Sequence, residues 1–128
     1  MDRKISVLLI DDEQHIRDFF GCHPALDAFD VSVAADGKEG LELARSVRPD
    51  VILLDWMLPD MDGMEVLAQL KNDPDIKNIP VYMLTAKKTP SDVGQAICEG
   101  VDGYFVKPFN ISKLVETLRR KIAATVSR

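Results

Sequence analysis

Residues 49–63 have the sequence PDVILLDWMLPDMDG, in which four consecutive aliphatic residues, Val51 to Leu54, run directly into Asp55. A continuous apolar run of this length is typical of a parallel strand that helices cover on both faces. The proline, acids and glycine that close the segment favour a turn. Beyond Gly63, apolar residues recur at helical spacing. The segment is therefore predicted to form a buried strand, a turn and the start of a helix.

The same pattern of a short apolar run followed by a longer helical segment occurs five times along the chain. The runs are Ile5–Ile10, Val31–Ala35, Val51–Leu54, Pro80–Leu84 and Tyr104–Val106. Such alternation indicates an α/β fold, and at this length it favours a doubly wound, five-stranded parallel sheet with five helices. In the second run, Val31-Ser32-Val33 alternates between apolar and polar residues, so this run is the candidate for an edge strand.

Each intervening segment has apolar residues that could form one buried helical face. The first helix is expected to end or kink near Cys22, because Pro24 removes a helical hydrogen bond. The fourth contains Gly94, which lowers helical stability by about 1 kcal/mol relative to alanine. The apolar positions of the five helices are Ile16, Phe19 and Phe20; Leu41, Leu43 and Ala44; Met64, Leu67 and Leu70; Val93, Ala96 and Ile97; and Leu114, Val115, Leu118 and Ile122.

Composition sets limits on the class of protein. The chain has 128 residues, of which 46% are hydrophobic and 29% charged, as expected for one globular domain over residues 1–128. The formal net charge of -5 gives no overall attraction to nucleic acid. No apolar run approaches the roughly 20 residues that span a bilayer, and the N-terminal residues do not resemble a signal peptide. We therefore expect no direct nucleic-acid or membrane contact, and a cytoplasmic location.

Polar and charged residues follow four of the five apolar runs. Asp11 and Asp12 follow the first, Asp55 the third, Thr85 the fourth and Lys107 the fifth. In a doubly wound sheet, ligands bind beyond the carboxyl ends of the strands. Three carboxylates there would repel one another unless a cation joined them, and an oxygen-only ligand set suits Mg2+. Lys107 and the Thr85 hydroxyl could contact a phosphoryl group. The pattern indicates a phosphoryl site built around an aspartate.

Each of these residues has an ordinary structural interpretation when it is taken alone. Asp12 could be a helix N-cap, and Lys107 could be a surface lysine. The strand that ends at Asp55 resembles a Walker B strand, but the chain has no GxxxxGK[ST] loop. The functional interpretation depends on four strand ends carrying such groups in order.

Across Lys4 to about Ala124, the sequence resembles the receiver domains of bacterial two-component response regulators. The matching segments are LLIDDE (8–13), ADG (35–37), PDVILLD (49–55), MLPDMDG (57–63), LTA (84–86) and GVDGYFVKPF (100–109). The resemblance implies the flavodoxin-like strand order 2-1-3-4-5.

The resemblance also assigns residue roles. Asp55 would accept the phosphoryl group, and Lys107, followed by a cis proline bond, would hold it. Mg2+ would be bound by Asp12 directly, by Asp11 through water, by Asp55 and by the Met57 backbone carbonyl. Thr85 and Tyr104 would form the switch pair. Met57 and Lys87 would flank the phosphoryl group and influence its lifetime.

The function implied is a phosphorylation-dependent signalling switch rather than an enzyme with an external substrate. The phosphoryl donor would be a sensor histidine kinase or a histidine phosphotransfer protein. The downstream partner would bind the face of helix four, strand five and helix five, and phosphorylation could promote a homodimer. One alternative is a phosphorylation-independent scaffold. Another is an aspartyl-phosphate phosphohydrolase, which would need an acid where Met57 stands.

Overall fold

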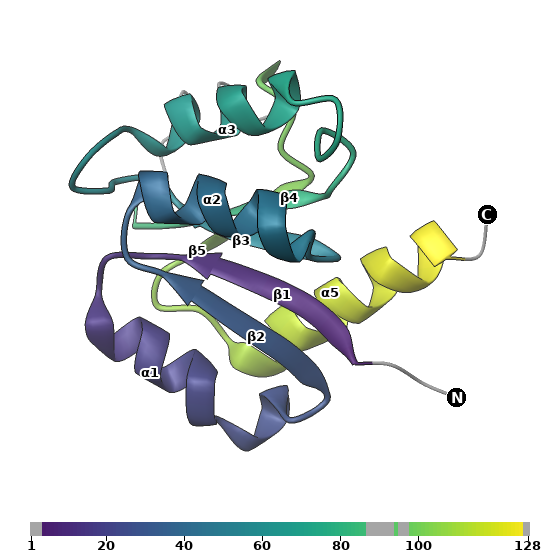
Figure 1. Cartoon of the computed structure of the whole chain (residues 1–128). Coiled ribbons are helices and arrows are strands. Elements are labelled where there is room, and N and C mark those ends of the chain that lie inside the picture. The colour runs from purple at the N-terminus through teal and green to yellow at the C-terminus, as the bar shows by residue number, and fades with distance from the viewer. Residues whose placement is uncertain (1–3, 87–93, 95–97, 127–128) are drawn as a thin grey trace.

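A computed structural model of the chain describes residues 4–86, 94 and 98–126, with residues 85, 125 and 126 described by their backbone alone. Five parallel strands form one sheet in the order β2-β1-β3-β4-β5, with helices on both faces (Figure 1). The elements are β1 (Ile5–Ile10), α1 (Gln14–Cys22), the short 3-10 helix η1 (Pro24–Leu26), β2 (Phe29–Ala34), α2 (Gly37–Val47), β3 (Val51–Asp55), α3 (Gly63–Asn72), β4 (Val81–Thr85), β5 (Gly103–Val106) and α5 (Ile111–Val126).

This architecture confirms the predicted sheet, its order and its edge strand. β2 lies at the edge, next to β1, whereas β1, β3 and β4 are interior. α1 ends at Cys22, and Pro24 begins η1, as the proline predicted. The predicted fourth helix, with Val93, Ala96 and Ile97, lies outside the described residues. Only Gly94 and Cys98 of that segment are described, both in helical conformation.

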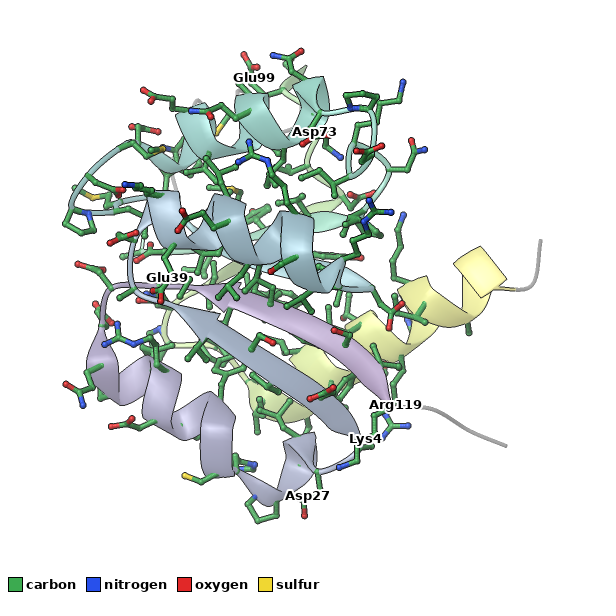
Figure 2. The ribbon with its side chains drawn as sticks, viewed as in Figure 1. Lys4, Asp27, Glu39, Asp73, Glu99 and Arg119 are labelled. Atoms are coloured by element: carbon green, nitrogen blue, oxygen red, sulfur yellow. The ribbon has the colours of Figure 1, made fainter. Side chains whose placement is uncertain are left out.

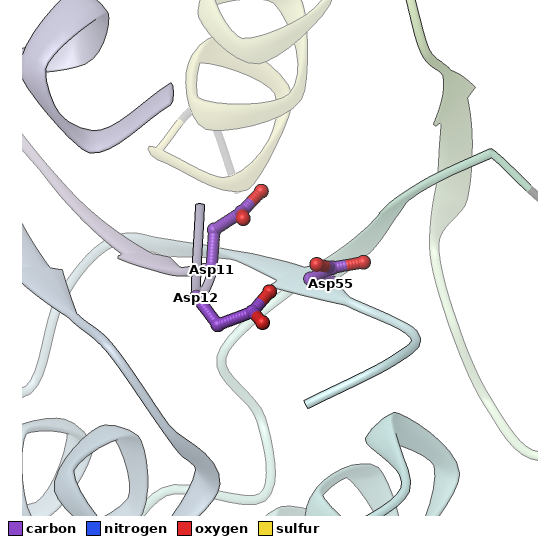
Figure 3. A group of neighbouring side chains, drawn as sticks. All are labelled: Asp11, Asp12 and Asp55. Atoms are coloured by element: carbon purple, nitrogen blue, oxygen red, sulfur yellow. The ribbon is translucent and has the colours of Figure 1, made fainter. Parts of the chain in front are cut away.

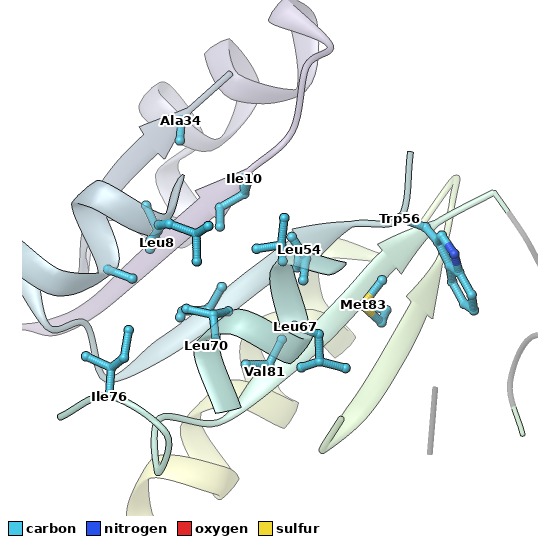
Figure 4. Packing of buried hydrophobic residues seen from close by; sticks show 14 residues of the cluster. Leu8, Ile10, Ala34, Leu54, Trp56, Leu67, Leu70, Ile76, Val81 and Met83 are labelled. Carbon is cyan, nitrogen blue, oxygen red and sulfur yellow. The ribbon is translucent and has the colours of Figure 1, made fainter. Parts of the chain in front are cut away.

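The core has two layers, one on each face of the sheet. On one face α2 and α3 cover the side chains of β1, β3 and β4, and Figure 4 shows Leu67 and Leu70 of α3 in this layer with Leu54 and Met83. On the other face α1 and α5 cover the sheet, with Phe20, Leu114 and Leu118 fully buried. Complete burial of such side chains contributes roughly 1.5–3 kcal/mol each. The sheet is thus fixed from both sides.

The strand register decides what lies together at the carboxyl edge of the sheet. Ile10 pairs with Leu54, so Asp11 and Asp55 follow paired positions on adjacent strands. Asp55 pairs with Leu84 on the other side. Thr85 pairs with Val106, the residue before Lys107. The polar residues after these strands therefore converge near one point. Among the described residues, no helix is long and apolar enough to cross a membrane.

Candidate functional site

Three aspartates gather at the carboxyl ends of β1 and β3. One carboxylate oxygen from each of Asp11, Asp12 and Asp55 lies within 4.8 Å of the other two, and Figure 3 shows the three side chains facing a common space. Asp11 is completely buried and Asp55 is 6% exposed, and they are the buried polar or charged residues of the described chain. Asp12 is exposed. The predicted acidic cluster is therefore present.

Lys107, directly after β5, supplies the positive charge of the cluster. Its Nζ lies 2.8 Å from Asp11 Oδ2 and 3.6 Å from Asp55 Oδ2. Glu13 Oε2 is also 3.6 Å away. The Lys107–Pro108 peptide bond is cis, as the sequence resemblance implied. Lys107 is thus a partly buried cation facing the carboxylates, rather than a free surface lysine.

Burial and charge alter the proton affinity of this cluster. Burial, followed by the negative charge of Asp11, raises the pKa of Asp55 to about 7, against the opposing effects of Lys107 and the Met57 N–H. Burial acts to lower the pKa of Lys107, but its hydrogen bond to Asp11 and the charges of Asp55, Asp11 and Glu13 together raise it. Lys107 is therefore a permanent cation at neutral pH. The excess negative charge around Asp55 is only partly balanced.

Backbone contacts fix the β1–α1 loop that carries the first two aspartates. The Asp11 N–H donates to the Ala34 carbonyl at 3.0 Å, and Asp11 Oδ1 accepts from the Glu13 N–H at 2.9 Å. Arg17, one turn into α1, donates to the Asp11 carbonyl at 2.8 Å. Sequence reasoning missed the roles of Glu13 and Arg17, because both depend on how α1 leaves the sheet.

The β3–α3 loop is held closed at its base. Met57 forms an isolated antiparallel bridge with Asp62, and the Gly63 N–H donates to the Trp56 carbonyl at 2.6 Å. A Cβ atom at Gly63 would lie 2.5 Å from the Asp55 carbonyl oxygen, so only glycine fits there without moving the backbone. Asp62 caps α3 by accepting from the Met64 N–H at 2.8 Å. The acidic residues before Gly63 thus form the predicted turn.

The other predicted site residues are Met57, Thr85, Tyr104 and Lys87, and the structure shows fewer contacts between them and the acidic cluster. The Met57 N–H lies 3.4 Å from Asp55 Oδ1, while the Met57 side chain is 66% exposed. Thr85 is the last residue of β4, beside the strand that leads to Lys107. Tyr104 lies in β5 and is 40% exposed. Lys87 lies outside the described residues. The structure therefore brings together Asp11, Asp12, Asp55 and Lys107.

The donor set fits a small divalent cation. All three clustered side chains offer oxygen, the ligand atom that Mg2+ prefers. Lys107 contacts two of the three carboxylates, and its one positive charge cannot neutralise all three, which leaves net negative charge for a cation to balance. Asp12 is exposed, so the cluster is open to solvent on that side.

Comparison with known proteins identifies relatives over nearly the whole chain. The family model of the response regulator receiver domain matches residues 7–119. The DNA-binding dual master transcriptional regulator RpaA of Synechocystis is 37% identical over 119 residues, which are 93% of this chain and 49% of that protein. The probable transcriptional regulatory protein TcrX of Mycobacterium tuberculosis is 36% identical over 94% of this chain and 51% of its own length. The chain thus spans about half the length of these curated relatives.

Solved structures of single receiver domains match over almost their full length. The receiver domain of Francisella response regulator 1452 superposes with a TM-score of 0.87 at 33% identity, covering 95% of this chain and 99% of that one. Chemotaxis protein CheY4 of Vibrio cholerae gives a TM-score of 0.83 at 36% identity, covering 91% and 98%.

Proposed function

This chain belongs to the response regulator receiver family, and from that premise we propose that Asp55 accepts a phosphoryl group from a histidine kinase or a histidine phosphotransfer protein. The observation that carries the proposal is the position of Asp55, a buried carboxylate between two further aspartates and a lysine ammonium 3.6 Å away. No other described aspartate has these surroundings. Receiver domains are signalling modules. The proposal includes that the domain catalyses the hydrolysis of its own aspartyl phosphate.

In the proposed transfer, a deprotonated oxygen of Asp55 attacks the phosphorus atom in line. The new O–P bond forms as the P–N bond of phosphohistidine breaks, and the imidazole keeps the bonding electron pair. The product is an aspartyl phosphate. Such transfers depend on positioning and on neutralising the phosphoryl oxygens. Lys107 would contact one of these oxygens, and the Thr85 hydroxyl would donate to another.

The metal in this proposal is Mg2+. Asp12 and Asp55 would bind it directly, Asp11 through water, and the Met57 backbone carbonyl would be the fourth protein contact. When bound, the ion supplies positive charge that offsets repulsion between the carboxylates and the incoming phosphoryl group. The residues themselves hold the geometry: Asp11 is fixed by Lys107, and Asp55 is fixed by its place at the end of β3.

The downstream partner is proposed to bind the face formed by β5, α5 and the predicted fourth helix. β5 and α5 are described, whereas most of the predicted fourth helix lies outside the described residues. RpaA and TcrX are regulators about twice this length. Phosphorylation would change partner binding on that face, which includes Tyr104 of β5. Dimerisation of phosphorylated chains belongs to the same proposal.

The assignment of Asp55 is tested by phosphorylation with a small-molecule donor. Incubation with acetyl phosphate and Mg2+ should add one phosphoryl group, measured by intact mass. Asp55→Asn should add none. Asp50→Asn is the matched control: Asp50 lies next to the opposite end of the same strand, where its carboxylate accepts from the Ser6 N–H, and asparagine keeps an acceptor oxygen. Equal modification of Asp55→Asn and the parent would refute the proposal and favour a phosphorylation-independent scaffold or another acceptor.

The metal assignment is tested with Trp56, the only tryptophan in the chain, which is buried directly after Asp55. Mg2+ should change its fluorescence in the absence of phosphate. Asp12→Ala should weaken the affinity at least about tenfold, or about 1.4 kcal/mol, because a direct ligand is lost. Asp36→Ala removes a partly buried acid that follows β2 near the same edge of the sheet, and it is the control for general charge loss. A titration unchanged in Asp12→Ala would count against the site.

A further inference from the structure

Asp60, at the tip of the β3–α3 loop, makes a contact outside its own loop. Its Oδ1 accepts from the Gly37 N–H at 2.8 Å, and its Oδ2 accepts from the Lys38 N–H at 2.9 Å. These are the first two residues of α2, and the first N–H groups of a helix have no partner within it. The two backbone hydrogen bonds lower the pKa of Asp60, so its carboxylate is charged at neutral pH. Asp60 therefore docks the loop tip onto the start of α2.

A second residue caps the same helix end from the position directly before α2. Asp36, the N-cap of α2, accepts from the Glu39 N–H at 2.8 Å, and Glu39 Oε1 accepts from the Ala35 N–H at 2.8 Å. Figure 2 shows Glu39 at this end of α2. Asp36 and Asp60 thus divide the free N–H groups of the first turn. One cap is local to α2, whereas the other joins α2 to a distant loop.

Apolar packing supports the Asp60 contact. A Cβ atom at Gly37 would lie 2.5 Å from Met61 Cγ and 2.9 Å from its Sδ, so the side chain next to Asp60 lies directly on the first residue of α2. Met61 also packs against the buried layer beneath α2 and α3. Residues 60 and 61 therefore fix the loop tip by a polar and an apolar contact at the same place.

This docking connects the two halves of the acidic site. The loop begins directly after Asp55 and includes Met57, and its base is closed by the Met57–Asp62 bridge. α2 packs on β1 and β2, and β1 leads into Asp11 and Asp12. The contact of Asp60 with α2 therefore sets the place of the loop relative to the strand that supplies the other two carboxylates.

We propose that Asp60 is a positioning residue for the phosphoryl-acceptor site, holding the Met57 backbone where it can complete the Mg2+ ligand set. It touches neither the metal nor the phosphoryl group, and it acts through the loop. The inference rests on the proposed function, because it explains how that site reaches its working geometry.

The test compares Asp60→Ala with Asp36→Ala. Both substitutions remove a side-chain cap from the same helix end, so both should lower thermal stability to a similar extent. Only Asp60→Ala should weaken Mg2+ binding, by about tenfold in a Trp56 fluorescence titration, as expected when a group that supports a ligand is removed. Asp36→Ala should bind Mg2+ within about twofold of the parent. Asp60→Asn, which retains one acceptor oxygen, should fall between the parent and Asp60→Ala.

A kinetic measurement separates positioning from a general structural role. Phosphorylation of Asp60→Ala by acetyl phosphate should be slow at low Mg2+ and should recover toward the parent rate at saturating Mg2+. Equal weakening of Mg2+ binding in Asp60→Ala and Asp36→Ala would overturn the proposal, because the effect would then act through α2 stability. Unchanged binding in Asp60→Ala would overturn it as well. If the parent itself shows neither Mg2+ binding nor phosphorylation, the proposed function fails, and this inference fails with it.

Discussion

At the scale of single residues, Met57 combines a fixed backbone with an exposed side chain. Its N–H points toward Asp55 Oδ1, and its backbone pairs with Asp62, yet its side chain is 66% exposed beside a buried acid. A thioether is a poor hydrogen-bond acceptor and cannot orient an attacking water as an amide could. We therefore expect the Met57 side chain to shield an aspartyl phosphate on Asp55 rather than to assist its hydrolysis.

Met57→Asn should shorten the lifetime of the aspartyl phosphate. Placing a polar group beside the phosphoryl group would lower the barrier to hydrolysis by about 1 kcal/mol, a several-fold increase in rate. The measurement is loss of phosphorylated protein over time with excess Mg2+ and no phosphatase. Met57→Leu, which stays apolar, should retain the parent lifetime. An asparagine variant that is equally stable or longer-lived would assign control of the lifetime elsewhere, with Lys87, the other predicted flanking residue, the next to test.

The cluster itself could be predicted from sequence, but its supporting contacts could not. Asp11, Asp12, Asp55 and Lys107 each follow an apolar run, and the carboxyl ends of parallel strands share one edge, so their convergence follows from topology alone. Arg17 and Asp60 support the site from a helix and a loop tip. Their contacts depend on the directions in which α1 and the β3–α3 loop leave the sheet, which no local sequence pattern specifies.

At the scale of elements, the far ends of α2 and α3 are joined by Asp73. Figure 2 shows Asp73 beyond the end of α3, where its Oδ1 accepts from the Asp75 N–H at 3.0 Å. Its Oδ2 lies 3.2 Å from Arg45 Nε in the last turn of α2. The hydrogen bond from the Asp75 N–H, followed by the charge and hydrogen bond of Arg45, lowers the pKa of Asp73. The exposed ion pair itself should contribute little, so the backbone contact should dominate.

Asp73→Asn should therefore destabilise the protein in a pH-dependent way. A carboxyl group with a depressed pKa in the folded state stabilises the fold above its unfolded pKa, and this contribution is lost as pH falls through the folded value. The free energy of unfolding of the parent should exceed that of Asp73→Asn at neutral pH, and the difference should narrow below about pH 4. Urea denaturation at several pH values measures it. Asp75→Asn is the control: it keeps the backbone N–H that donates to Asp73, so it should lower the free energy of unfolding less at pH 7. If the difference in free energy of unfolding between the parent and Asp73→Asn did not change with pH, the assignment would be wrong.

The elements were more predictable than their boundaries. Apolar runs located all five strands, but β2 begins at Phe29, two residues before the alternating Val31-Ser32-Val33, because Phe29 pairs with Ile5 across the sheet. β4 begins at Val81 rather than Pro80, since proline has no N–H to donate, and the Pro80 carbonyl instead accepts from the Ile52 N–H. Strand pairing, which is not local in sequence, decided both boundaries.

At the scale of the whole molecule, the strand order places only one strand, β4, between the acidic site and the edge strand β5. β4 lies between β3, which carries Asp55, and β5, which carries Tyr104 and leads into Lys107. The Lys107 ammonium donates a hydrogen bond to Asp11 Oδ2 at 2.8 Å. A phosphoryl group on Asp55 would compete with Asp11 for the Lys107 ammonium. Because Lys107 directly follows β5, a shift of its side chain would act on β5 first. α5 follows β5 after a short connection, so a shift of β5 should alter α5 next.

Phosphorylation is therefore expected to alter β5 and α5 in addition to the loop at Asp55. A phosphoryl group adds about -1.5 to -2 charge and strong acceptors, which would draw the Thr85 hydroxyl toward the site. The Tyr104 ring, which is 40% exposed, would then move inward. Shifting such an equilibrium from 1:99 to 99:1 requires about 5.5 kcal/mol of differential binding, which a few charge-assisted hydrogen bonds together with a metal ion can supply.

Beryllofluoride, a phosphoryl mimic, allows this expectation to be measured at equilibrium. Amide chemical shifts and amide exchange, recorded with Mg2+ and with or without beryllofluoride, should differ in β5 and in the first turns of α5, and not in the edge strand β2. Asp55→Asn should show none of these differences, because the mimic binds the acceptor carboxylate. Changes confined to the β3–α3 loop would mean that the mimic binds at Asp55 without altering the structure of β5 or α5. The receiver would then hold a phosphoryl group without acting as a switch, since no partner-binding surface beyond the loop would distinguish its two states.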